Sequence, residues 1–223
     1  MLSRFASNWV SRLYRRNANS VYNVGIRVAD LAFGILRLAF LSLILGSRGY
    51  GKWIYFVAIS NLVRTVTLSG MEQVAVRGYL QGHGGNFRRL MPWRIALSLL
   101  GSAVLLGFFA VERRTDIELA QVFLAGALFF PTANALTLSR TYFLANERLR
   151  ELFWIRFGEF AILFMVALLP LLHHRSIVWF VVTWFAVPSL VNAGMTTYAW
   201  RRSEPARAAE PGVFRLSALV SAA

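Results

Sequence analysis

Residues 21–45 read VYNVGIRVADLAFGILRLAFLSLIL, an apolar stretch in which only Arg27, Asp30 and Arg37 are charged. A helix needs about 20 mostly apolar residues to cross the hydrocarbon core of a bilayer. Five further apolar stretches of 17 to 27 residues follow, at 53–79, 95–111, 117–142, 155–172 and 176–200. They do not alternate with period two, and a backbone in lipid must satisfy its own hydrogen bonds, so we expect helices rather than strands. The sequence therefore predicts an all-α polytopic membrane protein with six transmembrane helices in residues 21–200.

The composition of the 223-residue chain supports this fold class. It is 57% hydrophobic and 15% charged, whereas a soluble domain carries about 25% charged residues to wet its surface. The net charge of +14 does not indicate a nucleic-acid partner, because the positive residues lie at the ends of apolar stretches instead of on one soluble face. The absence of cysteine excludes disulfides, zinc thiolates and cysteine nucleophiles.

Positive residues are unequally divided between the two sides of the predicted bundle. One side holds fifteen: Arg4, Arg12, Arg15, Arg16, Arg77, Arg88, Arg89, Arg94, Arg140, Arg148, Arg150, Arg156, Arg201, Arg202 and Arg207. The other side holds five: Arg48, Lys52, Arg113, Arg114 and Arg175. Cytoplasmic connections carry the excess of Lys and Arg. We therefore expect the fifteen in the cytoplasm, with both termini on that side, as six spans require.

The two ends of the chain are expected to lie outside the six spans. In residues 1–20, apolar residues recur at helical spacing among arginines, which indicates either a basic amphipathic helix on the membrane surface or a disordered positive anchor. Residues 201–223 begin as a polar cytoplasmic linker and end in an apolar stretch, VFRLSALVSAA, that is too short to cross a bilayer. We expect this stretch to be the start of a truncated seventh helix.

Charged residues within the spans are the first candidates for function. Arg27, Asp30 and Arg37 share one face of the first helix, and Asn61 and Arg64 share one face of the second. An arginine at bilayer depth costs roughly 2.5 to 3.5 kcal/mol on insertion scales. Arg27 and Asp30 could form an internal ion pair that only holds helices together. For Arg37 and Arg64, which have few acids to neutralise them, we predict a water-accessible cationic cavity suited to an anionic cargo, since guanidinium groups match phosphate geometry.

Three acids are candidates for coupling transport to an ion. Asp30 lies near the middle of the first span, and Glu72 follows Arg64 by about two turns. Glu159 could titrate during transport, but its spacing from Arg156 favours an interfacial ion pair.

Three positions are predicted to interrupt helices. Gly70 follows a serine and is expected to break the second helix. Pro131 and Pro188 each precede an asparagine, Asn134 and Asn192, by about one turn. Such interruptions line substrate paths in some transporters, and in other proteins they are kinks satisfied by neighbouring helices.

No constellation of catalytic or metal-binding residues emerges from the sequence. His173 and His174 lie in a predicted outer turn without further metal ligands. The glycine-rich residues 82–85 are not followed by the Gly-Lys-Ser/Thr of a phosphate-binding loop, and no nucleophile is paired with a base. We therefore expect no enzymatic activity, no cofactor and no metal site.

Residues 34–80, GILRLAFLSLILGSRGYGKWIYFVAISNLVRTVTLSGMEQVAVRGYL, resemble the opening of polysaccharide repeat-unit (O-antigen type) flippases of the multidrug/oligosaccharidyl-lipid/polysaccharide exporter superfamily. The shared pattern is a first helix that ends in Leu-Gly, a glycine-rich turn, an aromatic second helix with a Ser-Gly break and a basic segment. The lipid II flippase branch has a Gly-x-x-Arg motif in its first helix and Asn-Leu-x-Arg in its second. Gly34-Ile35-Leu36-Arg37 and Asn61-Leu62-Val63-Arg64 are similar to these motifs.

The resemblance implies that Arg37 and Arg64 line a central cavity and contact the pyrophosphate of a lipid-linked saccharide. It implies flipping of undecaprenyl-diphosphate-linked saccharide units across the bacterial plasma membrane by alternating access, for cell-surface polysaccharide biosynthesis. Family members have two six-helix lobes, so this chain would be the amino-terminal lobe and its partner the second. Two other readings of the sequence are a six-helix permease subunit of an ATP-driven polysaccharide exporter and a non-transporting membrane fragment.

Overall fold

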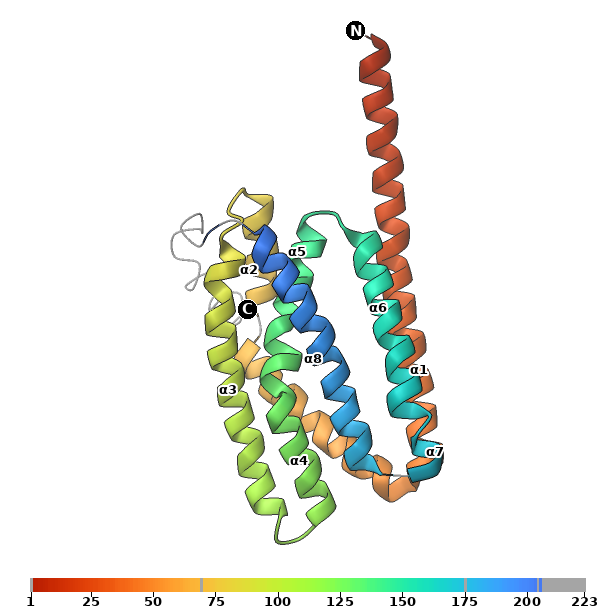
Figure 1. Ribbon diagram of the computed structural model, residues 1–223, viewed down its shortest axis with the longest axis vertical. Coiled ribbons are helices and arrows are strands. Elements are labelled where there is room, and N and C mark those ends of the chain that lie inside the picture. The colour runs from red at the N-terminus through yellow and green to blue at the C-terminus, as the bar shows by residue number, and fades with distance from the viewer. Residues whose placement is uncertain (1, 69, 175, 204, 206–223) are drawn as a thin grey trace.

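The computed structural model describes residues 2–68, 70–174, 176–203 and 205, and every regular element in these ranges is helical (Figure 1). Four helical stretches are long and apolar enough to cross a membrane: Ser20–Thr65, Asn86–Glu112, Ile117–Ala145 and Ile177–Arg202. The prediction of an all-helical fold is confirmed for this part of the chain. The expected start of a seventh helix, in residues 213–223, lies outside the described residues.

Helix α1 runs from Leu2 to Leu68 and contains the first predicted span and the beginning of the second. Its halves are separated at Gly46, whose φ of 64° and ψ of −176° belong to a backbone region that only glycine adopts readily. The first half extends away from the other helices toward the N-terminus and lies beside α6 (Leu149–Leu163), while the second half crosses behind α8 (Ile177–Arg202) (Figure 1). Residues 2–20 continue α1 without a break, although the sequence suggested a separate segment.

The second predicted span, 53–79, is divided in the structure. α1 ends at Leu68, and α2 (Met71–Leu80) begins after Gly70, whose φ is 82°. A positive φ is unfavourable for residues with a Cβ atom, so glycine at this position permits the change of direction. The interruption predicted at Gly70 is confirmed.

The remaining helices form an irregular bundle around the second half of α1. They are α3 (Asn86–Glu112), α4 (Ile117–Phe130), α5 (Ser139–Ala145), α6, α7 (Leu171–His174) and α8. A π-helical turn, η1 (Pro131–Ala135), and a short 3₁₀ turn, η2 (Leu136–Leu138), join α4 to α5. The fifth predicted span, 155–172, is divided among α6, a second π-helical turn, η3 (Phe164–Leu168), and α7. His173 and His174 fall in α7 instead of in a turn.

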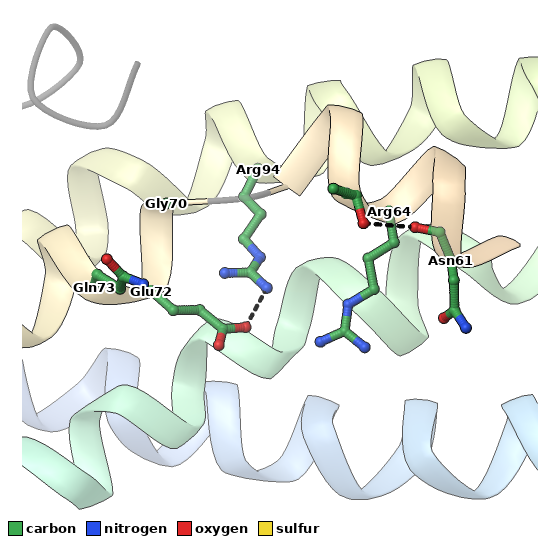
Figure 2. Close-up of a pocket in the computed structure, with 7 residues that line it drawn as sticks. Asn61, Arg64, Gly70, Glu72, Gln73 and Arg94 are labelled. Atoms are coloured by element: carbon green, nitrogen blue, oxygen red, sulfur yellow. Dashed lines mark hydrogen bonds and ion pairs between the residues drawn. The ribbon is translucent and has the colours of Figure 1, made fainter. Parts of the chain in front are cut away.

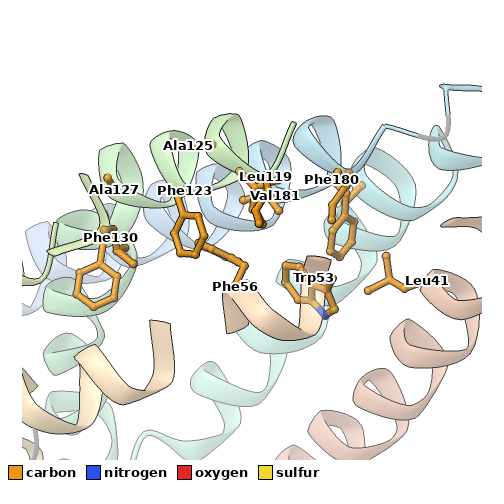
Figure 3. Packing of buried hydrophobic residues seen from close by; sticks show 14 of the residues in the cluster. Leu41, Trp53, Phe56, Leu119, Phe123, Ala125, Ala127, Phe130, Phe180 and Val181 are labelled. Atoms are coloured by element: carbon orange, nitrogen blue, oxygen red, sulfur yellow. The ribbon is translucent and has the colours of Figure 1, made fainter. Parts of the chain in front are cut away.

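Two hydrophobic clusters occupy opposite ends of the bundle. The first, which we call the α4 cluster, joins α1, α4 and α8 through aromatic contacts such as Trp53 with Phe180, whose ring centroids are 4.9 Å apart (Figure 3). The second, the α2 cluster, includes Val74, Leu90 and Met195. The burial of large apolar side chains at both ends stabilises the arrangement of the helices between them.

A polar layer separates the two hydrophobic clusters. On α3, Leu90 belongs to the α2 cluster and Leu105 to the α4 cluster, and the buried Arg94, Ser98 and Ser102 lie between them in sequence. On α6 the buried Glu159, and on α8 the buried Asn192, likewise lie in sequence between buried residues of the two clusters. Polar side chains from several helices are therefore brought to one level of the bundle.

An ion pair ties α1 to α4 at the far end of the α4 cluster. Lys52 lies 2.8 Å from a carboxylate oxygen of Asp116 and 2.6 Å from one of Glu118. Asp116 also caps α4 by accepting a hydrogen bond from the backbone N–H of Leu119 at 3.0 Å. The hydrogen bond from Lys52 lowers the pKa of Asp116 below its usual range.

Candidate functional site

Two adjoining cavities open in the polar layer. The larger, about 410 Å³, is the charged chamber (Figure 2), and it is lined by Asn61, Arg64, Thr65, Gly70, Glu72, Gln73 and Arg94. The smaller, about 300 Å³, is the aromatic chamber, and it is lined by Arg37, Trp53, Phe56, Val57, Ser60, Asn61, Arg64, Phe130, Asn134, Trp184 and Phe185. Asn61 and Arg64 belong to both chambers. Both predicted cavity arginines therefore line the aromatic chamber.

Arg64 is the cation shared by the two chambers. It lies one turn after Asn61 in the second half of α1, so both side chains occupy the face that borders the cavities. Its guanidinium group reaches into the charged chamber (Figure 2). Within the described part of the chain, Arg64 is exposed and forms neither a hydrogen bond nor an ion pair. Its five N–H donors are available to a ligand.

Arg37 is held by aromatic rings instead of a carboxylate. Its guanidinium carbon lies 4.6 Å from the ring centroid of Trp184 and 5.8 Å from that of Trp53. Cation–π contacts of this kind contribute about 0.5 to 2 kcal/mol. The Nε of Arg37 is buried without a hydrogen-bond partner. The aromatic chamber thus contains a cation that is positioned by packing and not neutralised by the protein.

Arg94 lines the charged chamber, although the sequence did not indicate it as a site residue. The sequence assigned it to the cytoplasmic end of the third span, but its side chain is 1% exposed and lies in the polar layer. Its Nη2 donates to Glu72 Oε1 at 2.5 Å, to Thr137 Oγ1 at 2.7 Å and to the carbonyl of Asn134 at 3.3 Å. The first of these contacts is the dashed line beside Arg94 in Figure 2. Glu72, a predicted coupling residue, is thus one half of an ion pair with Arg94.

A second ion-pair network links α1, α6 and α5. Arg156 lies 2.7 Å from both Asp30 and Glu159, and Arg140 lies 3.5 Å from Glu159. The predicted pair of Glu159 with Arg156 is confirmed. Asp30 pairs with Arg156 across the helices rather than with its neighbour Arg27, which is exposed and has no ion pair among the described residues.

Three of the fifteen arginines expected in the cytoplasm form ion pairs with carboxylates of other helices. Arg94, Arg140 and Arg156 were included among the fifteen cytoplasmic arginines, yet each is paired with a carboxylate inside the bundle. Without them twelve positive residues stand against five, so the asymmetry persists. An arginine near the end of an apolar stretch cannot be distinguished in sequence from one in the adjoining loop.

Side chains of neighbouring helices donate to backbone carbonyls in the π-helical turn at Pro131. The carbonyl of Ala133 accepts from Asn192 Nδ2 at 3.1 Å, and that of Asn134 accepts from Arg94. The interruption predicted at Pro131 is confirmed as the π-helical turn η1. The one predicted at Pro188 is wrong, because α8 is continuous from Ile177 to Arg202.

The distribution of charges in the polar layer determines what the site can bind. Asp30, Glu72 and Glu159 each form their ion pairs with arginines other than Arg37 and Arg64, although Arg64 also attracts Glu72 across the charged chamber. Both chambers therefore carry uncompensated positive charge, which favours an anionic ligand. Among the described residues no group of three or more His, Cys, Asp or Glu side chains is placed to hold a metal ion.

Neither a known protein family nor a curated protein nor a solved structure matches this chain.

Proposed function

We propose that this chain is one lobe of a membrane transporter that flips undecaprenyl-diphosphate-linked saccharides across the bacterial plasma membrane. One observation carries the proposal: Arg37 and Arg64 line one cavity, and neither forms an ion pair with a carboxylate in the part of the chain that the structure describes. The three acids of the same layer are used by other arginines. The resemblance of residues 34–80 to flippases supplies the class of cargo.

A diphosphate matches the chemistry of the two free guanidinium groups. Arginine presents a planar fork of N–H donors that binds phosphate oxygens in pairs. Each hydrogen bond to a charged group contributes about 1.5 to 3 kcal/mol when it is buried. The aromatic walls beside Arg37 lower the local dielectric constant, which strengthens these interactions.

The proposed architecture is six transmembrane helices that form one half of a two-lobe transporter. The first and second would be the two halves of α1, which together make the apolar stretch Ser20–Thr65. The fifth would be α6 with η3, in which Arg156 and Glu159 interrupt the apolar sequence. A second lobe would close the chambers and would alternate with this one between inward-open and outward-open states.

Ligand binding by arginine variants tests the proposal. The purified protein in lipid nanodiscs is titrated with undecaprenyl diphosphate, and undecaprenol serves as the uncharged ligand. We expect Arg37→Ala/Arg64→Ala to weaken diphosphate binding by a factor of about 100, because each lost charge-assisted bond removes about 1.4 kcal/mol or more. The wild type and the variant should bind undecaprenol with equal affinity.

Arg77→Ala/Arg150→Ala is the matched control. It removes the same charge from exposed positions that line neither chamber. Equal loss of binding in both double variants would mean that net charge alone attracts the lipid, and unchanged binding in Arg37→Ala/Arg64→Ala would refute the proposed site. In cells with the complete assembly, the same cavity variant should insert normally and abolish glycan export.

A further inference from the structure

Three oxygen atoms converge on a single nitrogen in the wall of the charged chamber. Glu72 Oε1, Thr137 Oγ1 and the carbonyl oxygen of Asn134 lie 2.5, 2.7 and 3.3 Å from Arg94 Nη2. The three oxygens are also close to one another, since Thr137 Oγ1 is 3.1 Å from Glu72 Oε1 and 2.6 Å from the carbonyl of Asn134. They come from three separate elements, α2, η1 and η2.

The geometry is a poor match for a guanidinium group. Arginine and a carboxylate usually form two parallel hydrogen bonds, from two nitrogens to two oxygens. Here Glu72 meets one nitrogen through one oxygen, and the Nε and Nη1 of Arg94 are buried without partners. A buried donor without a partner is unfavourable. A site built for arginine would satisfy these two groups.

The same oxygens are a good match for a small spherical cation. One carboxylate, one hydroxyl and one backbone carbonyl are hard oxygen ligands. The carbonyl of Asn134 lies in the π-helical turn after Pro131, where it also accepts a backbone N–H and, at 2.6 Å, the hydroxyl of Thr137. We propose that Glu72, Thr137 and the Asn134 carbonyl form a monovalent-cation site whose resident cation is the side chain of Arg94.

A tethered cation has a functional consequence. The guanidinium is covalently attached, so it cannot exchange with sodium or potassium on either side of a membrane. Glu72 is then not a residue that couples movement to a cation gradient in the native protein, in contrast to the expectation from the sequence. This consequence holds whatever ligand the chambers take.

Removal of the tethered cation should uncover the site. Thermal unfolding of wild type and Arg94→Ala is followed in detergent, in sodium chloride and in N-methylglucamine chloride of equal ionic strength. We expect no difference between the salts for wild type. For Arg94→Ala we expect a saturable rise of about 3 °C or more in Tm with sodium, because a ligand that binds only the folded state stabilises it.

Two control variants separate site binding from general salt effects. Arg94→Ala/Thr137→Val lacks one of the three ligands and should lose the sodium response. Arg94→Lys keeps a tethered positive charge and should show no sodium response. A folded Arg94→Ala that does not distinguish the two salts overturns the proposal, as does a sodium-specific rise in the wild type.

Poor folding of the alanine variant is also informative. Arg94→Gln preserves more of the side-chain volume and serves as the second test. If neither variant folds even when it is purified in 0.5 M sodium chloride, a value about threefold above ordinary physiological ionic strength, the proposal is again contradicted, because a bound cation should replace the missing charge.

Discussion

The arginines of the polar layer differ in what surrounds their guanidinium groups. Arg94, Arg140 and Arg156 contact carboxylates, whereas Arg37 contacts indole rings and Arg64 faces a cavity. A buried charge without a counter-ion is unfavourable unless water or a ligand reaches it. The contrast therefore separates arginines that hold the helices together from arginines that can bind a ligand.

Residue positions were predicted better than residue partners. The spacing of Asn61 and Arg64 was sufficient to place them on one helix face, because helical periodicity is a local property. The partners of Asp30 and Glu72 could not be predicted, since Arg156 and Arg94 lie on other helices. Only the packing of the bundle determines which charges meet.

Glu159 provides a test of the ion-pair network at the residue scale. It is 3% exposed and contacts both Arg156 and Arg140, so Glu159→Gln leaves two partly buried positive charges without their shared partner. We expect a loss of roughly 3 kcal/mol in the free energy of unfolding, measured by chemical denaturation in detergent micelles. Glu151→Gln on the same helix is the control, because Glu151 pairs with Arg148 at the surface. The control should change the free energy of unfolding by less than about 1 kcal/mol, and equal losses would contradict the assignment.

At the scale of elements, the interruptions of the helices determine the shape of the chambers. Gly70 ends one helix at the charged chamber, and η1 supplies Asn134 to the aromatic chamber. The sequence correctly indicated breaks at Gly70 and Pro131. It also suggested one at Pro188, where α8 accommodates the proline without ending. A proline removes one hydrogen bond, but neighbouring helices decide whether the helix stops.

Substitution of Gly46 tests whether the stability of the protein depends on the change of direction in the middle of α1. A Cβ atom at Gly46 would meet no atom within 4 Å, so a substitution there is unfavourable only through its backbone conformation. We expect Gly46→Ala to lower the free energy of unfolding by roughly 1 to 3 kcal/mol. Gly107→Ala also has open space, but no positive φ, and should be neutral or slightly stabilising. A neutral result for Gly46→Ala in chemical denaturation would show that α1 can be continuous.

At the scale of the whole molecule, two hydrophobic clusters enclose a polar layer. The hydrophobic stretches predicted helices because about 20 apolar residues have few other solutions in a bilayer. They did not predict the two separate clusters or the split fifth span, because these depend on contacts between α6, α8 and the second half of α1. The burial of Arg94 also depends on long-range packing, so the sequence did not predict it.

The unequal distribution of positive residues predicts the orientation of the molecule. A green fluorescent protein fused after residue 205 should fluoresce in bacterial cells, because we expect this position in the cytoplasm. A fusion after Arg114, in the connection between α3 and α4, should not fluoresce. Fluorescence from the second fusion alone would reverse the orientation and, with it, the side from which cargo enters.

The most direct test of the central claim uses the absence of cysteine from the chain. Asn61→Cys places a thiol at a position that lines both chambers. Leu62→Cys places one at the adjacent apolar position, where the leucine side chain is 65% exposed. In membranes, the rate of modification is measured with anionic and cationic methanethiosulfonate reagents. We predict that Asn61→Cys reacts faster with the anionic reagent, that Arg37→Ala/Arg64→Ala removes this preference, and that Leu62→Cys is unreactive. A cysteine at position 61 that is as unreactive as one at position 62, or that shows no preference for the anion, would contradict a wet cationic cavity.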